Sequence, residues 1–359
     1  MANLYGKSWT RDELLQRVGD ISQLARIKPT TLADGFEDGV KSLDVTNGSG
    51  LTFSVLASRG LDISTATYNG HALAWRSAQT DKHPAFFEPT EKNWLRTFYG
   101  GLLVTCGLTT IGMDSEDAGQ KLGLHGRASH LPATYVTYSG EWEGDEYHLS
   151  VSGKMREAII FGENIEWRRT IHTRLGEKRF WVIDEVENMG YSTSPHMFLY
   201  HINLGFPVVN ENSRFFSPTV VAEPRDSVAE VGKEDYNRFQ PPTSGFNEKC
   251  YFHTMKPNAE GLVTTGIVNP DLLNGEGLGL YVTYHQSQFP YFCEWKMMGQ
   301  GNYVVGLEPG NALVLGRAKE RELGRLQFIE PGEIRKYHTE FGVVSGKADI
   351  DGLIQKTSI

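Results

Sequence analysis

Short segments in which apolar and polar residues alternate recur along most of the chain, and they constrain its fold more than any other feature. Residues 51–57 alternate apolar residues with threonine and serine, as a half-buried strand does. Turn-forming pairs such as Asn47-Gly48 and Pro331-Gly332 interrupt the pattern. Comparable segments lie at 102–108, 134–138, 147–152, 165–173, 179–186, 197–203, 261–268, 279–284, 303–308 and 325–329.

This succession predicts an all-β fold. Helical patterns of 10–15 residues do not alternate with the segments, which argues against a parallel α/β sheet. So many strands in 359 residues favour a large antiparallel sandwich. No linker divides the chain, so we expect residues 1–359 to form a single domain. Residues 211–247 are the least regular stretch and predict a long excursion over the surface or the mouth of a site.

A helix is predicted near the N-terminus alone. Residues 8–18 carry apolar residues on one helical face, and Thr10 with Glu13 has the pattern of a capping box. We therefore expect an N-terminal helical extension, over about residues 1–45, that packs on the β domain.

Composition excludes several classes of partner. The formal net charge is −9 and basic residues do not cluster, so we expect no nucleic-acid partner. No apolar run approaches the length of a membrane span. The three cysteines are too few and too widely spaced for a disulfide framework or a zinc knuckle, and the N-terminus lacks a signal-peptide pattern. We expect a cytoplasmic protein.

Two titratable residues lie in apolar segments near the middle and the end of the chain. By the period of a strand, His201 shares a face with Leu199 and Asn203, where it is either a core residue or a general acid. Glu308 follows an apolar strand and precedes Pro309. It is either a strand end at the surface or a partly buried base whose pKa is raised by desolvation.

Three further segments carry candidate binding residues. His125 and Arg127 alternate around Gly126 and can point to the same side, either toward a ligand or in a loop with a surface salt bridge. Arg59 and Asp62 lie in a turn or form a polar pair at the edge of a site. Trp295 is either a platform for a sugar ring or a core residue.

Motifs for other chemistries are absent from the sequence. The chain contains no P-loop, no G-x-G-x-x-G and no nucleophile elbow. His125, His201 and Glu308 would make a possible metal-ligand set, but no HxH or HExxH spacing occurs and nothing in the sequence brings the three together. We expect neither a metal nor a cofactor.

Taken in order, the segments resemble the aldose 1-epimerase (galactose mutarotase-like) superfamily, and most closely its DUF4432 branch. The resemblance covers residues from about 50 to 345 and implies a β-supersandwich with a carbohydrate cleft on one face. The matching pieces are residues 58–63, 68–75, 99–108, 124–127, 200–205 and 306–309.

The resemblance also implies roles for individual residues. His201 matches the histidine that protonates the ring oxygen, Glu308 the glutamate that removes the proton from the anomeric hydroxyl, and His125 a histidine that holds the sugar. Asn203 replaces a mutarotase aromatic residue and Arg127 a glycine, which indicates a substrate other than a free hexose.

The sequence thus predicts a mutarotase-like isomerase without a cofactor, acting on a monosaccharide or a modified sugar as a monomer or homodimer. An acidic or phosphorylated sugar would suit the arginines. The alternatives are a metal-assisted sugar isomerase and a carbohydrate-binding protein without catalysis. The predicted acid is His201 and the base Glu308, with substrate contacts from Arg59, Asp62, His125, Arg127, Asn203 and Trp295.

Overall fold

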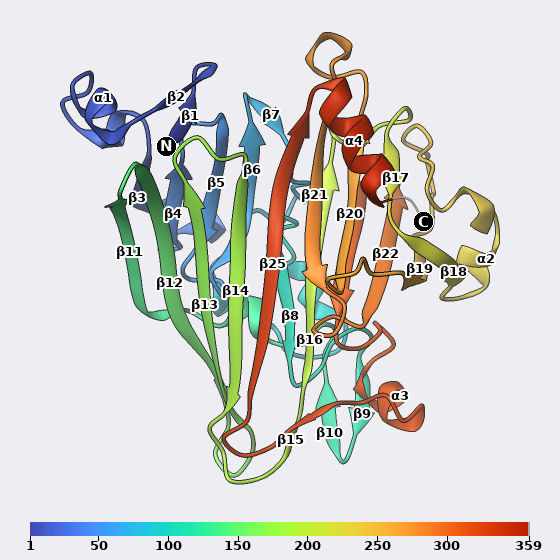
Figure 1. The fold of residues 1–359 in the computed structure, drawn as a ribbon. Helices are drawn as coiled ribbons and strands as arrows, with labels where there is room; N and C mark the ends of the chain where they lie inside the picture. The colour runs from blue at the N-terminus through green and yellow to red at the C-terminus, as the bar shows by residue number, and fades with distance from the viewer. Residues whose placement is uncertain (358–359) are drawn as a thin grey trace.

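Antiparallel strands are the main secondary structure in the computed structural model, which describes residues 1–357 (Figure 1). The largest sheet has eight strands in the order β11 (Thr134–Glu143), β12 (Glu146–Ala158), β13 (Asn164–Arg174), β14 (Arg179–Asn188), β25 (Ile334–Ser345), β21 (Leu278–His285), β20 (Leu262–Asn269) and β17 (Arg214–Phe216). A six-stranded sheet has the order β18 (Thr219–Pro224), β19 (Lys249–Met255), β22 (Tyr291–Met298), β23 (Tyr303–Gly310), β16 (Met197–Gly205) and β8 (Val104–Leu108).

Smaller sheets and short helices complete the fold. A five-stranded sheet runs β3 (Arg26–Thr31), β4 (Lys41–Thr46), β5 (Leu51–Leu56), β6 (Asp62–Tyr68) and β7 (His71–Ala72). Three pairs are β1 (Ala2–Leu4) with β2 (Lys7–Trp9), β9 (Ser115–Asp117) with β10 (Gln120–Leu122), and β15 (Ser194–Pro195) with β24 (Phe328–Ile329). The α-helices are α1 (Arg11–Leu15), α2 (Ser227–Glu230), α3 (Arg317–Glu322) and α4 (Lys347–Thr357). Among residues 1–357, no helix has both the length and the apolar character needed to cross a membrane.

The sheets form two layers around the main hydrophobic core. Isolated bridges, Ile63 to Leu103 and Ala74 to Leu204, join the five- and six-stranded sheets into one layer. This layer packs against the eight-stranded sheet, and both contribute to the core between them. The prediction of a large antiparallel β-sandwich is confirmed.

Strand β16 shows how the six-stranded sheet is buried on both faces. Phe198, Tyr200 and other even-numbered residues point into the core between the layers. Met197 and Leu199 belong instead to a second apolar cluster on the outer face, which the loops between β7 and β11 cover with aromatic residues. Because side chains alternate along a strand, the next odd-numbered position, His201, also faces outward.

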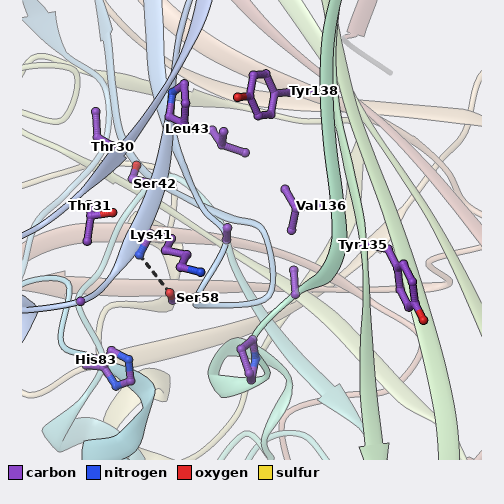
Figure 2. Close-up of a pocket in the computed structure, with 15 residues that line it drawn as sticks. Thr30, Thr31, Lys41, Ser42, Leu43, Ser58, His83, Tyr135, Val136 and Tyr138 are labelled. Carbon is purple, nitrogen blue, oxygen red and sulfur yellow. Dashed lines mark hydrogen bonds between the residues drawn. The ribbon is translucent and has the colours of Figure 1, made fainter.

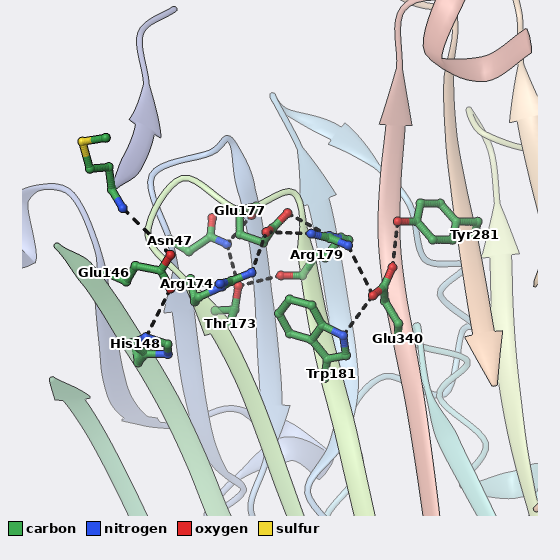
Figure 3. A network of polar contacts seen from close by, with 11 residues as sticks. Asn47, Glu146, His148, Thr173, Arg174, Glu177, Arg179, Trp181, Tyr281 and Glu340 are labelled. Atoms are coloured by element: carbon green, nitrogen blue, oxygen red, sulfur yellow. Dashed lines mark hydrogen bonds and ion pairs between the residues drawn. The ribbon is translucent and has the colours of Figure 1, made fainter. Parts of the chain in front are cut away.

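The exposed face of the eight-stranded sheet carries a network of paired polar side chains (Figure 3). Arg179 donates to Glu177 at 2.9 Å. Glu340 accepts from the Trp181 indole at 3.0 Å and from the Tyr281 hydroxyl at 2.9 Å. These side chains satisfy one another at a solvated surface, and none of the predicted site residues lies among them.

The N-terminal prediction is correct in one detail and wrong in extent. Thr10 caps α1 and forms the predicted capping box with Glu13. The helix ends after five residues, however, and residues 26–31 and 41–46 are strands of the five-stranded sheet rather than part of a helical extension. Strand β4 pairs with β5 and β3 pairs with β4, and this pairing decides their structure.

Candidate active site

A cleft of about 360 Å³ lies on the outer face of the six-stranded sheet. Its floor includes His201 from β16 and Glu308 from β23, while Trp295 from β22 contributes to its wall. The cleft is also lined by Lys92, Trp94, Phe98, His125, Arg225, Glu248 and Cys250.

Strand register brings the histidine and the glutamate together. Strands β16 and β23 are antiparallel neighbours in which Ile202 pairs with Leu307, so His201 lies opposite Glu308 on the same face. Nε2 of His201 is 3.2 Å from Oε1 of Glu308, and the side chains are 6% and 3% exposed. The two predicted catalytic groups, 107 positions apart in the sequence, are in direct contact.

Burial perturbs both groups in the direction that removes charge. It raises the pKa of Glu308 from 4.5 to about 8, with a further rise from Glu248 and an opposing effect from Arg225. Burial lowers the pKa of His201 to about 4. Between these values the pair holds one proton, which resides on the carboxyl group. Oε1 of Glu308 has no hydrogen-bond partner among the described residues.

Aromatic rings surround the pair. The ring centroid of His201 lies 5.1 Å from Phe98, 5.3 Å from Trp295 and 5.6 Å from His125. Trp94 stacks on Phe98 at 4.5 Å. Such rings present flat apolar faces, which suit the C–H faces of a sugar, while the pair supplies polar contacts.

A strained loop presents His125 to the cleft. His125 has a φ of 58°, and the following Gly126 has a φ of 75°. A Cβ at Gly126 would lie 2.4 Å from the Gly107 carbonyl oxygen, so only glycine fits there. Burial, and then the nearby His201, lower the pKa of His125 well below its usual value, so this ring is neutral. A neutral imidazole can both donate to and accept from a sugar hydroxyl.

Trp295 lines the cleft as predicted, whereas Asn203 does not. The indole Nε1 of Trp295 donates to Glu248 at 2.8 Å, which fixes the ring at the wall. Asn203 shares the outward face of β16 but is fully buried. Its Nδ2 donates to the carbonyl oxygens of Gly101 and His201, so it supports the backbone beside the cleft.

Arg59 is buried away from the cleft and fully occupied by the protein. Its Nε donates to the Ser129 carbonyl at 2.6 Å, and Nη1 donates to the Lys82 carbonyl at 2.7 Å. Nη2 donates to the Thr97 carbonyl at 3.1 Å. With an exposed fraction of 0%, Arg59 holds three loops together, and the structure does not bring it to a substrate.

Asp62 is likewise a core residue. It accepts from the backbone N–H and the hydroxyl of Thr105, and forms an ion pair with Arg169 at 2.7 Å. Burial raises its pKa to about 6. Arg127 is exposed and lines a separate cavity of about 220 Å³, together with Glu157. The substrate contacts predicted for Arg59, Asp62 and Arg127 therefore do not agree with their positions.

Sequence reasoning missed part of the cleft. Trp94 and Phe98 come from loops without a motif, and Arg225 and Glu248 flank the irregular stretch 226–247. That stretch overlaps the region predicted to form the mouth of a site. Among residues 1–357, no group of three or more His, Cys, Asp or Glu side chains is arranged to hold a metal ion.

A larger cavity, of about 600 Å³, lies between β3, β4 and β11 (Figure 2). Its lining includes Lys41, Ser58, His83 and Tyr138, but none of the predicted site residues. It has no carboxylate among its lining residues and so cannot supply an acid and base pair like that of the smaller cleft.

Solved structures share this fold. The "putative aldose 1-epimerase" of Klebsiella pneumoniae has a TM-score of 0.88 at 23% identity, over 94% of this chain and 89% of that one. A galactose mutarotase-like protein of Clostridium acetobutylicum has a TM-score of 0.60 at 12% identity, over 90% and 99%. Galactose 1-epimerase of Lactobacillus acidophilus has a TM-score of 0.57 at 11% identity, over 90% and 99%. These structural similarities establish a galactose mutarotase-like fold.

The sequence itself places the chain in a family. No curated protein matches it significantly. The model of DUF4432, a domain of unknown function, matches residues 37–343. The chain therefore belongs to the DUF4432 family.

Proposed function

We propose that the protein is an aldose 1-epimerase-like isomerase that interconverts sugar anomers in the cleft. The observation that carries the proposal is the buried contact between His201 and Glu308, enclosed by aromatic walls. The mutarotase-like fold supports it, because the proteins that share the fold include aldose and galactose 1-epimerases.

Direct contact between the two groups suits the anomeric centre. The ring oxygen and the anomeric hydroxyl oxygen of an aldose are bonded to the same carbon, C1. An acid and a base that lie side by side can therefore reach both oxygens from one edge of the sugar ring. The substrate hydroxyl would also satisfy Oε1 of Glu308, which has no hydrogen-bond partner among the described residues.

The reaction needs one proton on the pair. In ring opening, Glu308 removes the proton from the hydroxyl on C1 and His201 protonates the ring oxygen. The bond from C1 to the ring oxygen breaks as the C1 carbonyl forms, and rotation about C1–C2 exposes the other carbonyl face. Ring closure runs these proton transfers in reverse, so each group acts once as acid and once as base.

In the free protein, the proton shared by the pair is on the same group as at one stage of this cycle. In the free protein the proton resides on Glu308, as it does when the ring is open. The state that opens a ring has the proton on His201, and transfer across the 3.2 Å contact produces it without exchange with solvent. A sugar hydroxyl that donates to the carboxylate would stabilise that state.

The cleft narrows the choice of substrate. Its volume of about 360 Å³ suits a monosaccharide or a modified sugar. The cleft cations are Lys92 and Arg225, and Arg225 already forms ion pairs with Asp226 and Glu248. A negatively charged substituent would therefore meet Lys92 at the rim, rather than the arginines predicted from the sequence.

Anomer exchange of a panel of neutral, acidic and phosphorylated aldoses, measured by exchange NMR, tests the proposal. The wild-type protein should accelerate exchange of at least one sugar, and Glu308→Gln should abolish this while near-ultraviolet circular dichroism stays unchanged. Full activity in Glu308→Gln would overturn the role of Glu308. A sugar that raises the melting temperature while its exchange stays at the uncatalysed rate would instead indicate binding without catalysis.

A further inference from the structure

The three cysteines, far apart in the sequence, converge behind the proposed catalytic glutamate. Cys106 lies on β8, Cys250 on β19 and Cys293 on β22, and all three are free and buried. They belong to the same apolar cluster on the outer face of the six-stranded sheet. Cys106 and Cys293 are both close enough to Glu308 for its charge to raise the pKa of their thiols, after the larger effect of burial.

Cys293 is the thiol that touches the carboxyl group. In the register of β22 and β23, Cys293 pairs directly with Glu308, which places the two side chains next to each other on one face. Burial raises the pKa of Glu308, and the neighbouring thiol of Cys293 opposes this by lowering it. Cys293 does not line the cleft, so it lies beside Glu308 on the neighbouring strand without facing the open space.

A chain of contacts continues from Cys293 to the cleft wall. Cys250 lies diagonally opposite Cys293 in the register of β19 and β22, and both belong to the outer apolar cluster. Nη1 of Arg225 donates to Sγ of Cys250 at 2.9 Å. Arg225 therefore anchors Cys250, which packs in the same cluster as Cys293.

The chemistry of the thiol explains why a cysteine suits this position. A thiol is a weak hydrogen-bond donor, whereas a carboxylate that accepts several strong donors has a low pKa and is a poor proton acceptor. The titratable and charged groups that face Glu308 from the surrounding elements are His201, Cys106, Cys250, Cys293, His125, Arg225 and Glu248. Among them Cys293 is the cross-strand partner on β22.

We propose that Cys293 is a positioning residue for Glu308: its thiol holds the carboxyl against His201 and sets how readily that carboxyl releases its proton. The effect of Cys293 on catalysis rests on the function proposed above, but its effect on the carboxyl does not.

The test compares Cys293→Ser with Cys293→Ala, which differ by one hydroxyl group. The readout is the titration of the Glu308 carboxyl by 13C NMR, with its signal assigned by its absence in Glu308→Gln. Serine offers a stronger donor and should lower the pKa of Glu308 by about one unit, whereas alanine offers none and should raise it. Cys106→Ala is the matched control, because it removes a buried thiol from the same face without removing the donor to Glu308.

Kinetics provide a second readout. The alkaline limb of kcat should move in opposite directions in the two Cys293 variants, with KM unchanged, because Cys293 does not line the cleft. Opposite shifts in the carboxyl titration support the proposal. An unchanged titration, shifts of the same sign in both Cys293 variants, or a shift in Cys106→Ala as large as that in Cys293→Ala would overturn it. If the titration shifts as expected but the wild-type protein accelerates no anomer exchange, the proposed function fails and the role of Cys293 toward the carboxyl stands.

Discussion

The six-stranded sheet carries two buried histidine–glutamate pairs, one on each face. His201 and Glu308 lie 3.2 Å apart on the outer face, and His253 and Glu294 lie 3.3 Å apart between β19 and β22 on the inner face. Burial raises the pKa of both glutamates. By residue type, distance and burial alone, either pair would qualify as an acid and base.

Their surroundings separate the two pairs. The inner side chains are 0% exposed, and His253 and Lys296 both lower the pKa of Glu294. Lys296 itself donates to the Asp235 carbonyl of the loop that follows α2. The outer pair instead opens into the cleft, where Arg225 is the cation that lowers the pKa of Glu308. A perturbed carboxyl becomes a candidate catalyst where a substrate can reach it, and the inner pair does not line the cleft.

Replacing each histidine in turn should give the largest difference between the two pairs, in anomer exchange for one and in stability for the other. His201→Asn removes one of the two groups that carry the proton, so anomer exchange should fall about 10²–10⁴-fold with little loss of stability. His253→Asn breaks the inner pair and leaves a buried glutamate unpaired, so the free energy of unfolding should fall by about 3 kcal/mol while exchange is retained. Exchange NMR and urea unfolding measure the two effects.

The reverse pattern would contradict the assignment. Should His253→Asn lose anomer exchange while it unfolds like the wild-type protein, the inner pair would have to take part in the reaction. A variant of His201 that exchanges anomers at the wild-type rate would show that the outer pair is structural.

The pH dependence offers a second way to distinguish the pairs. Below about pH 4 both His201 and Glu308 are protonated, so no base remains, and above about pH 8 both are deprotonated, so no acid remains. The rate of anomer exchange should therefore have a bell-shaped pH profile with limbs near these values. Glu294→Gln should leave both limbs in place, because Glu294 lies on the opposite face of the sheet.

A shift of either limb in Glu294→Gln would mean that the two faces of the sheet are electrostatically coupled and that the pairs do not act independently. Rates measured over the stable pH range of each variant, with unfolding followed in parallel, exclude a change caused by denaturation.

The sequence predicted the fold and the outer pair for physical reasons that also explain what it missed. Alternation along β16 placed His201 on one face with Leu199, and the apolar strand before Glu308 left two interpretations, a strand end at the surface or a partly buried base. The contact between them depends on the register of β16 and β23, which local pattern does not encode.

Local sequence pattern also failed to predict the environment of Arg59 and the strand β25. Arg59 occurs in a turn that looks like the edge of a site, but its fork is filled by backbone carbonyls from three separate loops. In strand β25, burial alternates between Tyr337 and Phe341, but most residues of its first half are charged or polar. The apolar pattern in the sequence is therefore weak. The walls from Trp94 and Phe98 come from loops, whose positions depend on tertiary packing.

The smallest predicted effect concerns Trp295, which forms part of the cleft wall beside the outer pair. Trp295→Phe keeps an aromatic face but loses the hydrogen bond from Nε1 to Glu248, so the ring is less firmly held. We expect KM for the best sugar to rise about threefold to tenfold with kcat nearly unchanged, since the loss of one hydrogen bond to a charged group corresponds to about 1 kcal/mol.

Trp181→Phe is the matched control, because Trp181 also donates Nε1 to a glutamate, Glu340, but on the exposed face of the other sheet. Equal changes in KM for the two variants would show that the effect is a general consequence of losing an indole, and that Trp295 does not hold the sugar beside the outer pair.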